Sequence, residues 1–188
     1  MSTKNELYTG VSKAAWAYFF LYFDFNVSGI SVLPSFVCYL LILSAIRLLS
    51  GERRDLLLLR PLCVILALWN IGDWLMSWVG RDLDGQVVFL DLIIGAIGIY
   101  FHFQLFTDFA ALAAQYQGPE EHLDQRILNW RTIQTVLLTI IAVWTSVPHM
   151  ALTWADSVVL MLALIGLIAG LCLMAALFSL RKLFADDV

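Results

Sequence analysis

Asp73 is the residue of this sequence best placed to do chemistry inside a membrane. It lies within an apolar segment and shares one helical face with Asn70, Trp74 and Ser77, because the spacings i, i+3, i+4 and i+7 bring residues to one side of a helix. A charged group at membrane depth costs on the order of 2.5–3.5 kcal/mol on insertion scales, so it needs a partner or a function. The apolar segments hold no Lys or Arg at comparable depth. The compensating charge would therefore be a bound cation or a proton.

Two further acids, Asp24 and Asp91, are expected near the same outer side of the membrane as Asp73. Together with Asp73 they predict a site for a small cationic solute in the outer half of a helical bundle. The alternative is that these carboxylates accept hydrogen bonds from Trp, Tyr and Ser side chains and only hold the bundle together. Depth favours this alternative for Asp24 and Asp91, whereas for Asp73 the two interpretations carry equal weight.

His102 is the second candidate, as a proton relay, because its charge changes near physiological pH. The alternative is a packed core histidine. Asp91 shares a helical face with His102, but eleven residues at 1.5 Å each separate them by roughly 16 Å, so they do not form one site. Gly95 and Gly98 lie on the same face and are expected to let a neighbouring helix approach closely.

The last two apolar segments carry small and hydroxylated residues. Gly166 and Gly170 form a GxxxG pattern, which predicts close helix contact within the chain or between copies. Thr132, Thr135 and Thr139 follow one helical stripe, and their hydroxyls are expected to bond to their own helix or to glue neighbouring helices together.

Enzyme and metal chemistry find little support in the sequence. It contains no Gly-x-Ser-x-Gly elbow, no His-Glu-x-x-His and no phosphate-binding glycine loop, so we expect no catalytic residues and no cofactor. His122 and His149 are expected on opposite sides of the membrane, so no histidine cluster predicts a metal site. An intramembrane enzyme that uses Asp73 or His102 remains the least favoured of three functions.

The elements that must position these residues are six apolar segments in a single membrane domain, residues 1–188. We expect an all-α bundle of six transmembrane helices with short loops, and a short amphipathic helix at the membrane interface over about 119–131. The expected spans are 14–32, 33–49, 62–79, 87–107, 132–148 and 157–180, and the helix of the fourth is expected to continue to Tyr116. The first is interrupted by Asn26, Ser28 and Gly29, so it either leans on polar partners or stops short.

The distribution of basic residues predicts the topology. Ten of the eleven Lys and Arg residues fall on one side when six spans are laid out, and Arg81 is the exception. Short loops keep Lys and Arg in the cytosol, so both termini are expected there, in a plasma membrane of bacterial inner-membrane type. Hydrophobic residues make up 61% of the chain, against about 45–50% in soluble domains. The bilayer is thus the expected environment, and the basic residues indicate topology and not a nucleic-acid surface.

Three functions follow, in order. The first is binding or transport of a small cationic solute or a proton. The second is a non-catalytic interaction or regulatory subunit, as a homo-oligomer or with a partner membrane subunit. The third is the intramembrane enzyme. In size and topology the chain resembles the substrate-capture subunits of vitamin importers, and this resemblance implies solute binding. The small-residue packing motif of their first helix is not evident here, because Trp16 and Tyr18 stand among Ala14, Ala15 and Ala17.

Overall fold

The computed structural model describes residues 4–23, 26–27, 30–31, 34–78, 88–146 and 155–185. Within these ranges the chain forms six α-helices, one 3-10 helix and a two-stranded antiparallel hairpin. The α-helices are α1 (Lys4–Tyr22), α2 (Ser35–Leu49), α3 (Arg60–Ser77), α4 (Val88–Tyr116), α5 (Leu123–Ser146) and α6 (Ala155–Lys182). The 3-10 helix is η1 (Arg54–Leu59), and the strands are β1 (Asn26–Val27) and β2 (Ile30–Ser31).

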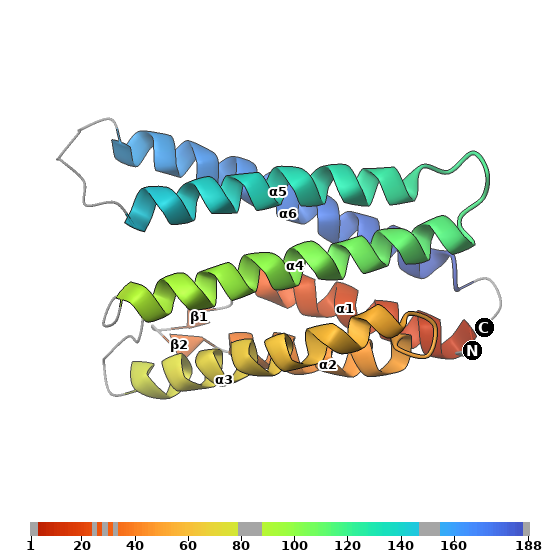
Figure 1. The fold of residues 1–188 in the computed structure, drawn as a ribbon, viewed down its shortest axis with the longest axis horizontal. Coiled ribbons are helices and arrows are strands. Elements are labelled where there is room, and N and C mark those ends of the chain that lie inside the picture. Colours follow the sequence, from red (N-terminus) through yellow and green to blue (C-terminus); the bar gives the residue numbers. More distant parts are fainter. Residues whose placement is uncertain are drawn as a thin grey trace.

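The six α-helices form a closed ring. Each helix packs on the next one along the chain, and α6 packs on α1 (Figure 1). Successive helices run in opposite directions, so the start of α1 and the end of α6 lie at the same end of the bundle (Figure 1). There the Arg181 guanidinium lies 5.5 Å from the centre of the Tyr8 ring.

Four helical segments are long and apolar enough to cross a membrane: Arg54–Ser77, Phe89–Tyr116, Leu123–Trp144 and Ser157–Lys182. The helix Ser35–Leu49 is apolar but shorter. The predicted all-helical fold is therefore confirmed, and its composition is that of a membrane protein. The number of spans and the side on which the termini lie stay predictions.

The first helix differs from the expected span over residues 14–32. α1 already begins at Lys4, because Leu7, Val11, Ala14 and Tyr18 recur at helical spacing and are all buried. It ends at Tyr22, and the backbone of Asn26–Val27 then pairs with Ile30–Ser31. The sequence around this hairpin is rich in turn formers and weak helix formers, which explains why one continuous helix to residue 32 does not form.

The predicted interfacial helix over about 119–131 is not a separate element. α5 runs unbroken from Leu123 to Ser146, so this segment and the expected fifth span form one helix. The start of α5 is capped by the Gln117 side chain, whose Oε1 accepts hydrogen bonds from the backbone N–H groups of Leu123 (2.9 Å) and Asp124 (3.2 Å). The break comes earlier, after α4 ends at Tyr116, as predicted.

The basic end of the bundle is the end at which α1 begins and α6 ends, and the opposite end is the far end (Figure 1). The helix termini and η1 at the basic end carry Lys4, Arg47, Arg53, Arg54, Arg60, Arg126, Arg181 and Lys182. α1 and α2 cover only the part of the bundle nearer this end, whereas α3, α4, α5 and α6 continue to the far end (Figure 1).

The buried side chains of α3, α4, α5 and α6 also lie in the part of the bundle nearer the basic end. In α3 the buried residues are Cys63, Leu66 and Ala67, and in α4 they begin only at Phe101. In α5 only Leu123 and Ile127 are buried among the described side chains, and in α6 burial begins at Ala169. The far-end halves of these four helices thus contribute no buried side chain among those described. The chain packs itself tightly only in the half where all six helices are present.

Candidate functional site

A hydrogen bond between α1 and α4 lies at the boundary between the tightly packed half of the bundle and the far-end half. Tyr18 Oη lies 2.5 Å from Nδ1 of His102, and the two rings meet edge to face with centroids 5.5 Å apart. Tyr18 is buried, with 1% of its surface exposed. Either the phenol donates to the imidazole or Nδ1–H donates to the phenol oxygen, depending on the tautomer. The bridging proton belongs to the phenol in one tautomer of His102 and to Nδ1 in the other.

A second tyrosine extends the contact toward α5. The Tyr22 ring stacks near that of Tyr18, with centroids 6.3 Å apart and planes inclined by 29°. The Gln134 side chain of α5 donates a hydrogen bond from Nε2 to Tyr22 Oη. Tyr22 also lies against the α6 backbone at Gly170, where a Cβ atom would overlap its ring. One turn of α1 thus joins three of the long helices near their middles.

Tyr39 of α2 closes this group from the other side. Its ring centroid lies 6.3 Å from that of His102, and 8% of its surface is exposed. The Tyr39 backbone carbonyl accepts a hydrogen bond from Cys63 Sγ of α3 at 3.3 Å. We call Tyr18, Tyr22, Tyr39, His102 and Gln134 the central cluster. Its contacts reach all six α-helices.

The residues predicted on the polar face of α3 are engaged mainly within that helix. Asn70 Nδ2 donates to the Leu66 carbonyl at 2.8 Å, and Ser77 Oγ donates to the Trp74 carbonyl at 2.7 Å. The Trp74 ring packs edge to face on Phe36 of α2, and its indole N–H has no hydrogen-bond partner among the described residues. The side chains of Asn70 and Ser77 thus form hydrogen bonds within α3, whereas the Trp74 indole N–H is a donor without a partner among the described residues.

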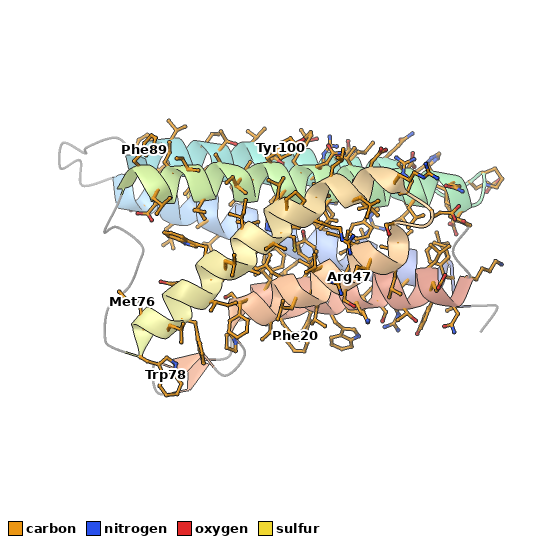
Figure 2. All side chains as sticks on the ribbon, turned by 60° about the horizontal axis from the view of Figure 1, so that its bottom comes forward. Phe20, Arg47, Met76, Trp78, Phe89 and Tyr100 are labelled. Atoms are coloured by element: carbon orange, nitrogen blue, oxygen red, sulfur yellow. The ribbon has the colours of Figure 1, made fainter. Side chains whose placement is uncertain are left out.

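The predicted acids lie on two helices that diverge. Asp73 on α3 and Asp91 in the first turn of α4 are both half-buried, and each takes part in a hydrogen bond or an electrostatic interaction. α3 runs obliquely to α4, so that Met76 and Trp78 at its end lie away from Phe89 (Figure 2). Asp24 lies outside the described residues.

A groove of about 370 Å³ lies between α3 and α4, lined by Ile65, Leu68, Trp69, Gly72 and Ile94. Its lining is apolar except for the Trp69 indole. Gly95 and Gly98, which were predicted to let a neighbouring helix approach closely, differ in how near they lie to other residues. A Cβ atom at Gly98 would stand 3.9 Å from a Leu66 methyl group, whereas one at Gly95 would meet no described atom within 4 Å.

The two glycines of the GxxxG pattern have different surroundings. Gly170 is covered by Tyr22, as described above, but a Cβ atom at Gly166 would meet no described atom within 4 Å. Close packing within the chain therefore requires a glycine at 170. The surface beside Gly166 is open.

Sequence reasoning missed a buried carboxylate near the basic end. Asp108 of α4 is 2% exposed, and its Oδ1 lies 3.5 Å from Gln104 Nε2 and 4.0 Å from Arg53 Nη2. Its Oδ2 and Arg53 Nε lack hydrogen-bond partners among the described groups. The available signal was an acid within a long apolar helix, but the expected span ended at residue 107, so Asp108 was placed outside the membrane.

Arg131 was missed as well. Its Nη1 donates to Thr107 Oγ1 at 2.7 Å, and its guanidinium carbon lies 4.0 Å above the centre of the Phe103 ring. These contacts fasten α5 to α4 on the basic-end side of the central cluster. Among the described residues, no three His, Cys, Asp or Glu side chains lie close enough together to hold a metal ion.

Comparisons of the chain with protein-family models, with curated proteins and with solved structures find no match. The arrangement of the residues themselves is thus the basis for inferring function. It offers a Tyr–His hydrogen bond at the boundary of the packed core, with half-buried acids on the far-end side.

Proposed function

We propose that the chain is a multi-pass membrane protein that binds a small cationic solute or a proton from the far end and passes it across the membrane. Both termini would lie in the cytosol of a bacterial cell. The ten described Lys and Arg residues all belong to the basic-end half of the bundle, which supports a cytosolic basic end.

The observation that carries the proposal is the early end of α1. Its last residue, Tyr22, contacts Gln134 and Gly170 near the middles of α5 and α6, and a β-hairpin follows instead of further helix. Lipid cannot satisfy the backbone of non-helical chain at membrane depth, so such chain must be covered by protein or face water. Interrupted helices at mid-membrane are a recurring feature of transporters, where they form the substrate site.

α1 and α2 then enter from the cytosol as a pair and return to it. Whether this pair crosses fully, giving six spans, or turns back within the membrane, giving four, both termini stay on the same side. The basic asymmetry holds in either case, because residues 24–34 contain no Lys or Arg.

The acids and the central cluster have distinct roles in this proposal. Asp73 and Asp91 supply negative potential in the loosely packed half, which attracts a cation from the far end. The Tyr18–His102 contact lies where the packed half begins. A proton that arrives at the Tyr18 oxygen displaces the hydroxyl proton onto Nδ1 of His102, and the imidazolium then releases its Nε2 proton toward the basic end. Asp108, six residues further along α4, is the next titratable group toward the basic end.

The test is proton flux in liposomes that contain the purified protein, with an imposed pH gradient and a pH-sensitive dye inside. Asp73→Asn keeps the shape and removes the charge, so flux should fall to the level of empty liposomes. His102→Gln should have the same effect. Thr139→Ala is the matched control, because that hydroxyl donates to a carbonyl of its own helix and Thr139 is not among the predicted cation-binding residues.

The wild type and Asp73→Asn also distinguish a protein that binds a small organic cation from one that carries protons. If the cargo is a small organic cation, methylammonium should raise the melting temperature of the wild type and not that of Asp73→Asn. Wild-type behaviour of Asp73→Asn in both assays would refute the proposal.

A second candidate function is that of an interaction subunit, and a specific observation favours it. In the described part of the chain the far-end halves contribute no buried side chain, and a Cβ atom at Gly166 would meet no described atom within 4 Å. Gly166→Leu should then disrupt an oligomer or a complex, as measured by native mass spectrometry in detergent, whereas Leu167→Ala should not. Unchanged assembly in Gly166→Leu would count against this function.

A further inference from the structure

The basic end holds a pocket of about 380 Å³ between the start of α5 and the end of α6. It lies apart from the central cluster and from the acids of α3 and α4. Arg126 and His122 line it from the α5 side, and Ser179 and Lys182 line it from α6. Leu123 and Leu183 supply apolar wall. Small-ligand sites commonly measure about 300–1,000 Å³, so this pocket suits a compact group.

Two of its basic side chains, Arg126 and Lys182, form no ion pair within the described ranges of the chain, and both are exposed at the pocket. Two acids are nearby. Glu121 lines the pocket, while Asp124 accepts a hydrogen bond from Gln117 Nε2 at 2.8 Å and is engaged there. Among the residues that line the pocket, Arg126 and Lys182 carry positive charge and Glu121 carries negative charge, so the lining has a net positive charge.

The donors match a phosphate group. A guanidinium offers a planar fork of N–H groups, an ammonium offers a compact positive charge, and the Ser179 hydroxyl adds a polar group between them. Ser179 Oγ already donates to the Ala175 carbonyl at 3.0 Å, so its oxygen is free to accept but its proton is committed. Arg126 and Lys182 are therefore the phosphate-binding groups, and Ser179 contributes shape.

The position of the pocket indicates where the phosphate comes from. Both flanking helices, Leu123–Trp144 and Ser157–Lys182, are candidate membrane spans, and the pocket lies at their basic ends. On the membrane side, α5 and α6 expose Ile133, Val136, Leu167 and Ile168, against which acyl chains can lie. Basic pockets between spans on the cytosolic side are typical sites for anionic headgroups.

We propose that this pocket binds the phosphate of an anionic phospholipid, with Arg126 and Lys182 as its ligands. The site holds the lipid at the seam between α5 and α6. It does not depend on what the central cluster carries, so it stands if the transport proposal fails.

The test compares phosphatidylglycerol with phosphatidylcholine on the intact chain in neutral detergent, with bound lipid counted by native mass spectrometry. The wild type should retain phosphatidylglycerol. Arg126→Gln/Lys182→Gln should bind it roughly tenfold or more weakly, because each removed charge weakens attraction to anionic lipid. The control Arg47→Gln/Arg54→Gln removes the same charge from exposed positions of the same end and should bind like the wild type.

A second variant keeps the proposal testable if the double variant does not fold. Glu121→Gln removes the one free carboxylate of the pocket and should tighten phosphatidylglycerol binding. Equal binding by the pocket variants and the control would overturn the proposal. Displacement of the lipid by millimolar inorganic phosphate would also overturn it, since the site would then serve a soluble anion.

Discussion

Tyr22, the last residue of α1, lies against the backbone of Gly170 near the middle of α6. The contact is so close that a Cβ atom on residue 170 would overlap the phenol ring. It fixes the depth to which α1 reaches and holds the Tyr22 hydroxyl toward Gln134.

Gly170→Ala should destabilise the protein by about 1–3 kcal/mol, because an added methyl group must displace the ring in a tightly packed place. Gly166→Ala is the matched control one turn away. It should be neutral or stabilise by up to about 1 kcal/mol, since alanine favours helix and finds open space there. Equilibrium unfolding in mixed detergent micelles measures both. Equal effects of the two substitutions would contradict the contact.

Tyr18→Phe should cost about 1–3 kcal/mol of stability, because it leaves a buried nitrogen of His102 without its partner. The double variant Tyr18→Phe/His102→Leu should lose less than the sum of the single variants, since the two groups form one interaction. Tyr8→Phe is the control, because its ring stays under Arg181. Additive losses would mean that the two side chains are independent.

Accessibility to an impermeant thiol reagent in intact cells tests the topology. In a cysteine-free chain of unchanged stability, cysteine at position 4, 54 or 126 should be protected until the cells are permeabilised, because the basic end is proposed to be cytosolic. Cysteine at position 83 or 150 should react at once. Labelling of position 54 in sealed cells would refute the proposed orientation.

Much of the helical framework could be predicted from the sequence, because the length of an apolar segment and the turn residues that bound it can be read from neighbouring positions in the chain. α4 was expected to end at Tyr116, where the Gly118-Pro119 pair stops a helix. The hydroxyls of Thr132, Thr135 and Thr139 bond to carbonyls one turn back on α5, at 2.7–2.8 Å, as one of the two interpretations held.

The depth of each helix could not be predicted, because it depends on partners distant in the sequence. The run from Ala14 looks like a span that begins at an apolar residue, yet α1 starts at Lys4 and ends where Tyr22 meets α6. For the same reason Asp108 escaped notice. Its ion-pair partner, Arg53, comes from the connection between α2 and α3, 55 residues earlier in the chain.

His102 was identified as a candidate from the sequence, but its partner Tyr18 was not. Tyr18 lies 84 residues away in the chain, and nothing local to either residue indicates the other. Whether Asp73, Asn70, Ser77 and Asp91 bind a cation stays a prediction.

The closure of the ring by α6 on α1 has a consequence for how the protein is made. α1 carries Lys4, Glu6 and Lys13 and is not among the helices apolar enough to cross a membrane by themselves. Gln134 and Gly170, which contact Tyr22, belong to α5 and α6, which leave the ribosome after α1. These contacts of Tyr22 can therefore form only after α5 and α6 have been synthesised, whereas α1 can pack on α2 as soon as α2 is made.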